Sequence, residues 1–254
     1  MRNFSKLLST VILIGFATTA SAQLIDEKDV SITLDMQPVL ELEMTTPNQI
    51  EFVFDDINEY QAGITNYGAT VLKVSSTVNW DLYAVGRSNT GDRFWSQEVS
   101  YGATTNSISE LPMSLLELRQ SRVNANMPVG GDYSANFSPT GTVSATNSLF
   151  VNDNGSATPP PVAGKYIAGH STTAESMTAG TYLNTGGGGV VASDFYYVMD
   201  YRILPGLPAI FPNASINDGT AEDLVTTAAS VDGKEYAEGG VYTMYVQYIL
   251  LEDQ

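Results

Sequence analysis

Alternation of apolar and polar residues between positions 32 and 44, interrupted on the polar face by Val39, is the feature that most constrains this fold. The apolar positions are Ile32, Leu34, Met36, Pro38, Leu40, Leu42 and Met44. Successive side chains of a β-strand point to opposite faces, so this period of two predicts a strand with one buried face. Because Pro38 lacks a backbone N–H, it predicts either an edge position or a break in the middle of this strand.

The same period recurs along the rest of the chain. Residues 70–84 predict a hairpin with a turn near 75–77, and Leu72, Val74, Val78, Trp80, Leu82 and Ala84 point inward. Further strands are expected at 49–54, 195–204 and 241–251, and shorter ones near 142–151, 165–168 and 180–183. Residues 55–63 have the composition of a polar turn. Residues 111–118 fit a short helix or an extended segment equally well.

Short strands with long polar connections, and no sustained helical period, predict an all-β protein. The specific prediction is an immunoglobulin-like β-sandwich with long polar loops. Residues 120–192 are rich in Gly, Ser, Thr, Asn and Pro, which is typical of loops around a few short strands. We expect a single elaborated domain over residues 23–254, with a candidate domain boundary at 152–164.

Residues 1–22 have the features of a secretory signal peptide. Arg2 and Lys6 precede the apolar stretch 7–17, and Ala20-Ser21-Ala22 is a small-residue cleavage site. We therefore expect export, with Gln23 as the first mature residue and no transmembrane segment after it. The expected location is the periplasm, the cell surface or an extracellular filament of a Gram-negative bacterium.

Charge and cysteine content exclude several classes of function. Removing Arg2 and Lys6 would take the formal net charge from −17 to −19, which opposes binding to nucleic acid. The chain contains no cysteine, so it forms no disulfide, zinc–thiolate site or catalytic thiol.

A catalytic reading of the sequence is weak. Gly169-His170-Ser171 resembles part of a nucleophile elbow, but His170 is the only histidine and sits directly beside Ser171. A neighbouring side chain cannot easily act as the base for that serine, and no second histidine exists to complete a triad. The glycine run 186–189 is not followed by a Lys-Ser/Thr pair, as a phosphate-binding loop would be. We expect a protein that is not an enzyme.

Two kinds of ligand fit parts of the sequence. Acidic and amide side chains cluster near Asp55 and Asp56, near Asn152 and Asp153, and near Asp218, and such oxygens can bind calcium. These residue types are also common in turns, and none of the clusters has EF-hand spacing. No other cofactor is expected.

Aromatic residues suggest a surface glycan as a second ligand. Trp95 and Tyr101 lie in a polar region, where their rings could stack on a sugar, whereas Trp80 lies on the inward face of its strand.

Both ends of the chain resemble those of Gram-negative fimbrial subunits. The first is the alternating segment 30–44 after the signal peptide, and the second is the closing sequence Gly239-Gly240-Val241-Tyr242-Thr243-Met244-Tyr245-Val246-Gln247-Tyr248. The resemblance implies an immunoglobulin-like sandwich that polymerises or adheres at the cell surface. It also implies that the N-terminal strand inserts into a neighbouring subunit.

Two hypotheses for the N-terminal strand remain open. A sandwich that lacks a strand exposes an apolar face and an open edge, which a strand from a neighbour can cover. The residues of such an assembly strand are Ile32, Leu34, Met36, Leu40 and Leu42. Alternatively, the strand pairs inside its own domain. A carbohydrate-binding module or an accessory subunit of a cell-envelope complex is the alternative from another functional class.

Overall fold

The structure is a computed structural model that describes residues 26–89, 94–103, 107–109, 111, 113–121, 133–138, 146–151, 165–170, 176–183, 195–203 and 236–253. The chain separates into a short N-terminal unit that ends at Met36 and a main body that begins at Gln37. The predicted signal peptide, the 152–164 boundary, Asn152, Asp153, Ser171, the glycine run and Asp218 lie outside the described residues.

The first sheet of the main body is antiparallel and contains the strand order β1-β2-β9-β6. Its strands are β1 (Leu40–Met44), β2 (Ile64–Ser76), β9 (Tyr196–Ile203) and β6 (Leu116–Gln120), and the short β8 (Gly180–Thr181) pairs with the end of β2. In the register of β1 on β2, Leu40 lies opposite Ser76 and Met44 lies opposite Leu72.

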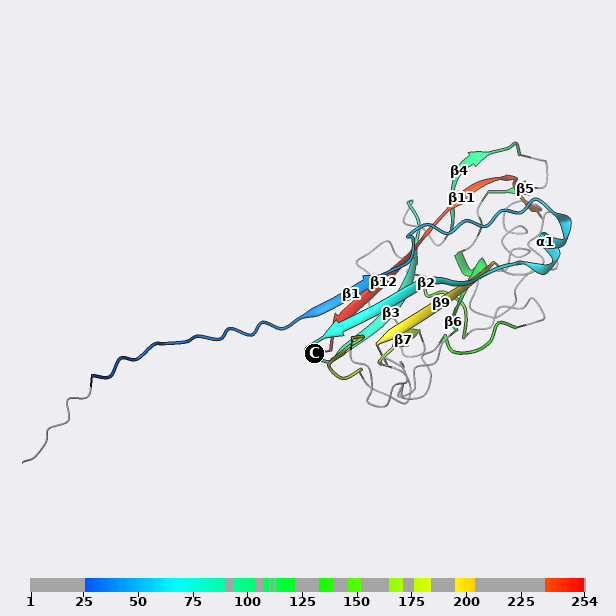
Figure 1. Ribbon diagram of the computed structural model, residues 1–254. Coiled ribbons are helices and arrows are strands. Elements are labelled where there is room, and N and C mark those ends of the chain that lie inside the picture. Colours follow the sequence, from blue (N-terminus) through cyan, green and yellow to red (C-terminus); the bar gives the residue numbers. More distant parts are fainter. Residues whose placement is uncertain are drawn as a thin grey trace, which may run out of the picture. The chain divides into compact units, whose positions relative to one another are not determined.

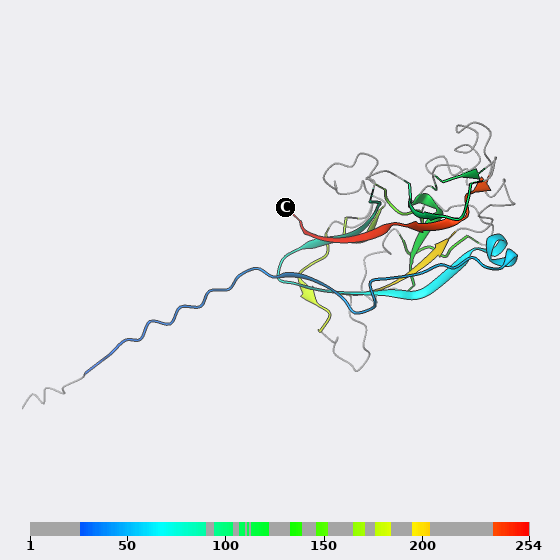
Figure 2. The same ribbon diagram turned by 90° about the horizontal axis from the view of Figure 1, so that it is seen from above.

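The second sheet has the order β12-β3-β7 and is also antiparallel. Its strands are β12 (Tyr245–Glu252), β3 (Trp80–Arg87) and β7 (Tyr166–Ala168). Two short ribbons accompany it, β11 (Gly240–Thr243) with β4 (Ser96–Ser100) and β10 (Tyr236–Ala237) with β5 (Ser107–Ile108). Figures 1 and 2 show that β2 and β9 lie in one layer and β12 in the other.

The hydrophobic core lies between these sheets and is drawn from both. Its buried members include Leu72 and Val74 of β2, Trp80 and Leu82 of β3, and Leu118, Tyr197 and Met199 of β6 and β9. The rings of Trp80 and Tyr197 meet edge to face, with 6.3 Å between their centroids. Antiparallel sheets around a shared core confirm the all-β prediction. The predicted inward row of 70–84 is buried except at Val78, which is half-buried.

Two local predictions need correction. Residues 49–54 contain no strand, although the side chains of Ile50, Phe52 and Phe54 pack against the core. Part of the predicted polar turn is the helix α1 (Ile57–Ala62), which Asp56 caps at its N-terminus. Residues 111–118 were expected to form either a short helix or an extended segment. Both occur there, since a 3₁₀ turn (Met113–Leu115) leads into β6. Within the described ranges, no helix has the length and hydrophobicity that crossing a membrane requires.

Candidate assembly site

Residues 26–36 form no helix and no strand. The apolar side chains of Val30, Ile32, Leu34 and Met36 are 82%, 89%, 80% and 81% exposed. Four apolar residues at every second position have the pattern of a strand with one apolar face. The side chains of this face are exposed to solvent. The alternation in the sequence therefore extends N-terminally beyond the residues that pair in a sheet.

The pairing within the main body begins immediately after Pro38. The backbone N–H of Val39 donates to Thr77 Oγ1 at 2.8 Å, and the Val39 carbonyl accepts from the Thr77 N–H at 2.9 Å. From Leu40 onward, the chain is hydrogen-bonded to β2 as an edge strand, which agrees with the position that Pro38 indicated. The structure therefore places Leu40 and Leu42 in β1, whereas Ile32, Leu34 and Met36 precede it.

The strands β1 and β12 are the outer strands of their sheets, and they contact each other across the body. In the part of the chain that the structure describes, β1 pairs only with β2, and β12 pairs only with β3. We call these two strands and their inward side chains the open margin. Its inward residues are Leu42 of β1 and Val246, Tyr248 and Leu250 of β12.

The open margin is less covered than the inner strands beside it. The inward residues of the margin are only half-buried, whereas Leu72, Val74, Leu82 and Ala84 of the adjacent inner strands are at most 1% exposed. Since these inner strands have neighbours on both sides and the margin strands do not, the difference follows from the missing strand contact.

A chain of hydroxyl groups fixes β12 against the first sheet. The hydroxyl of Tyr248 on β12 is hydrogen-bonded to that of Tyr201 on β9, which lies 2.7 Å from Thr70 Oγ1 on β2. Burial raises the pKa of both tyrosines, so the phenols remain neutral and able to donate. The register of β12 is therefore set by polar contacts as well as by its ladder with β3.

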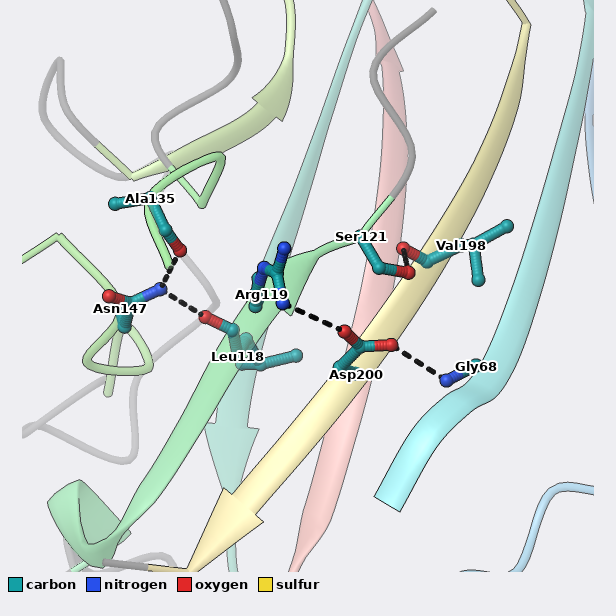
Figure 3. A network of polar contacts seen from close by, with 8 residues as sticks. All are labelled: Gly68, Leu118, Arg119, Ser121, Ala135, Asn147, Val198 and Asp200. Carbon is teal, nitrogen blue, oxygen red and sulfur yellow. Dashed lines mark hydrogen bonds and ion pairs between the residues drawn. The ribbon is translucent and has the colours of Figure 1, made fainter. Parts of the chain in front are cut away.

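A buried polar network on the outer side of β6 and β9 is a second candidate site. Asp200 is fully buried, accepts from the Gly68 N–H at 2.7 Å and lies 3.8 Å from Arg119 Nη1 (Figure 3). Beside this pair, Glu117 and Arg202 form a buried ion pair, with Arg202 Nε donating to Glu117 Oε2 at 2.7 Å. Because Arg119 lies opposite Asp200, and Glu117 opposite Arg202, the four charges form two neighbouring cross-strand pairs.

The rest of the network binds loop segments to these strands. Asn147 Nδ2 donates to the carbonyls of Leu118 and Ala135 at 3.0 and 2.9 Å, and the Ser121 hydroxyl donates to the Val198 carbonyl (Figure 3). The acidic and basic side chains of the two ion pairs compensate each other's charge, and the hydrogen bonds of Asn147 and Ser121 end at backbone carbonyls of the same chain. This arrangement favours a structural role over a ligand site. Sequence reasoning missed it because its members come from distant strands.

The lone histidine lies near a buried carboxylate. His170, with a positive φ of 34°, is half-exposed, and its Nδ1 is 3.8 Å from Asp81 Oδ2. Burial raises the pKa of Asp81, and the nearby Asp253 raises it further, while His170 acts in the opposite direction. Asp253 Oδ2 accepts from the Ser176 hydroxyl at 2.6 Å.

The predicted calcium ligands Asp55 and Asp56 lie at the start of α1. Asp56 Oδ1 accepts from the Asn58 backbone N–H at 2.7 Å, while Glu59 Oε2 accepts from the backbone N–H groups of Asp55 and Asp56. This reciprocal arrangement is a capping box, so these oxygens satisfy the helix end. Among the residues that the structure describes, no group of three acidic or histidine side chains could hold a metal.

The two candidate stacking residues have different surroundings. Trp95 is half-buried and packs against the core, whereas Tyr101, just after β4, is 74% exposed. Only Tyr101 of the pair therefore presents most of its ring to solvent.

No protein-family model matches the chain, and no curated protein sequence matches it.

Proposed function

We propose that this chain is an exported structural or adhesive surface subunit that assembles by donating its N-terminal segment to a neighbouring copy. The observation that carries the proposal is the uncovered apolar face of Val30, Ile32, Leu34 and Met36 in a chain that also has an open margin. Export and a location at the surface or in a filament rest on the predicted signal peptide.

The strand order supports an immunoglobulin-like sandwich with one position vacant in the described chain. In that fold, one sheet has the order A-B-E-D and the other contains C, F and G. The order β1-β2-β9-β6 corresponds to the first sheet, and β3 and β12 correspond to C and F. Among the described strands, none lies along the second edge of β12, where strand G would be.

The N-terminal segment has the chemistry that this position requires. A strand at the free edge of β12 would satisfy its backbone hydrogen-bonding groups and place alternate side chains over the half-buried residues Val246, Tyr248 and Leu250. Each apolar side chain that becomes fully buried contributes about 1.5–3 kcal/mol.

The connection to β1 disfavours pairing of the segment with its own β1. A tight reversal of the segment onto its own β1 would have to turn at Gln37 and Pro38, because Val39 is already paired with Thr77. Proline is disfavoured at the third position of the common tight turns. Since donor and acceptor are different surfaces of one chain, such contacts are head-to-tail and form either closed rings or open filaments.

The test compares two substitutions in adjacent positions of the segment. Leu34→Asn places an amide on the apolar face, and the control Thr33→Asn changes the polar face. Both positions are exposed, so we expect free energies of unfolding within about 0.5 kcal/mol of the wild type. Light scattering after size-exclusion chromatography should show oligomers for the wild type and Thr33→Asn, and monomers for Leu34→Asn.

A labelled peptide of residues 29–37 provides the complementary measurement. It should bind the full-length Ile32→Asn/Leu34→Asn variant, whereas the same peptide with Leu34→Asn should not. If Leu34→Asn instead lowers the melting temperature by several degrees, the segment belongs to its own domain and the proposal is wrong. A wild type that stays monomeric at millimolar concentration would also contradict it.

The exposed ring of Tyr101 supports adhesion to a surface glycan as a second candidate function. A glycan array probed with the wild type and with Tyr101→Ala would test it. Binding that Tyr101→Ala does not reduce would refute this role of the ring.

A further inference from the structure

The exposed N-terminal segment is acidic as well as apolar. Residues 26–36 contain four acidic residues, Asp26, Glu27, Asp29 and Asp35, against the single basic residue Lys28. Lys28 already lies 3.4 Å from Asp26, so it neutralises a charge within the segment. The segment therefore carries a formal charge of −3.

The open margin has the same sign. The two strands β1 and β12 together contain three acidic residues, Glu41, Glu43 and Glu252, and no basic one. Glu41 and Glu43 are exposed on β1, and Glu252 is exposed at the end of β12.

Lys73 of β2, which lies beside β1, already contacts an aromatic ring. Lys73 lies opposite Glu43 in the register of β1 on β2, and its ammonium is 4.6 Å from the centroid of the Tyr182 ring. One lysine beside a glutamate does not offset an acidic margin. Donor and acceptor surfaces therefore repel each other before their apolar residues meet.

We propose that this like-charge repulsion makes assembly between copies dependent on ionic strength, so that dilute salt keeps the subunits apart and saline conditions permit polymerisation. The inference rests on the proposed function and adds its regulation. Charges interact over about 30 Å at 0.01 M salt but only about 8 Å at 0.15 M. Electrostatics of this kind acts mainly on the association rate, while apolar burial holds the assembled state.

The experiment follows oligomer growth of the full chain by light scattering at about 10 mM and about 300 mM sodium chloride. We expect growth at least roughly tenfold faster at the higher concentration, in line with electrostatic effects on protein association rates. The Leu34→Asn variant should remain monomeric at both concentrations, which separates specific assembly from salting-out.

Two charge reversals locate the effect. Asp35→Lys lies in the segment. The control Glu98→Lys lies on β4, where the carboxylate of Glu98 accepts from the side chains of the half-buried Thr243 and the exposed Asn89. Each substitution changes the net charge by the same amount. We expect Asp35→Lys to speed assembly at low salt several-fold and to flatten the salt dependence, whereas Glu98→Lys should leave both close to the wild type.

The outcomes separate this inference from the function on which it rests. Oligomers that form equally fast at both salt concentrations overturn the charge dependence and leave donation of the segment intact. Equal effects of Asp35→Lys and Glu98→Lys show that only total charge matters, and they overturn the assignment to this interface. A chain that stays monomeric at both concentrations overturns the proposed function together with the inference.

Discussion

The buried ion pair between Glu117 and Arg202 gives the sharpest test of what stabilises this fold. Glu117 is fully buried and Arg202 is 6% exposed, and the guanidinium also donates from Nη1 to the Ser138 carbonyl at 2.6 Å. It lies 4.8 Å from the centroid of the Phe137 ring. Replacing the arginine by methionine removes all these polar contacts and leaves a buried carboxylate without its counter-charge.

Removing one partner of a buried pair costs about 3–5 kcal/mol. For a chain of this size, about 2–4 °C is lost per kcal/mol, so Arg202→Met should lower the melting temperature by roughly 6–20 °C. The double variant Glu117→Met/Arg202→Met removes both charges and should recover most of that loss, because burying a pair costs almost as much as the pair returns.

The assay is urea unfolding followed by far-ultraviolet circular dichroism on the wild type, both single variants and the double variant. Arg119→Met is the matched control, since this arginine is 26% exposed and lies 3.8 Å from its partner, and its loss should cost less. A double variant no more stable than Arg202→Met would show that desolvation of the carboxylate is not the dominant cost.

Three further predictions concern single positions. Burial raises the pKa of Asp81, so the wild type loses stability as pH rises from the unfolded value near 3.8 through the raised folded value; Asp81→Asn should therefore gain stability relative to the wild type as pH rises above 3.8, and parallel curves in urea titrations at several pH values would refute this. Gly169→Ala should destabilise the fold by about 1–3 kcal/mol, because φ there is +73° and an added Cβ overlaps the Asp81 carboxylate; an unchanged melting temperature would contradict the packing. Tyr248→Phe should cost about 1 kcal/mol by breaking the hydroxyl chain to Tyr201, measured by thermal melts in which Tyr245→Phe, at an exposed position, serves as the neutral control.

Alternation identified the longest strands of the fold. The hairpin of β2 and β3, the strand β9 and the final strand β12 all have inward rows that are visible in the sequence. A strand with one buried face alternates apolar and polar residues along the chain. The helix α1 was missed although Asp56 and Glu59 have capping-box spacing, a signal that could have identified its start.

Periodicity predicts a strand but not the partner of that strand. The alternation that continues from residue 30 to Met44 gives no sign that pairing starts at Leu40, and residues 49–54 pack against the core without entering a sheet. The ion pair between Glu117 and Arg202 was equally hidden, since it joins strands 85 residues apart in the sequence. Contacts of this kind depend on strand order, which local sequence does not encode.

The attachment of the N-terminal segment to the body also determines how the protein would respond to mechanical tension. A pull on the segment enters the body at Val39, through its two short hydrogen bonds to Thr77, and then loads β1 from its first residue. When the pull runs along the strand axis, all five residue pairs from Leu40 to Met44 share the load against β2 and must yield together. A pull across the strand would open the same ladder one pair at a time.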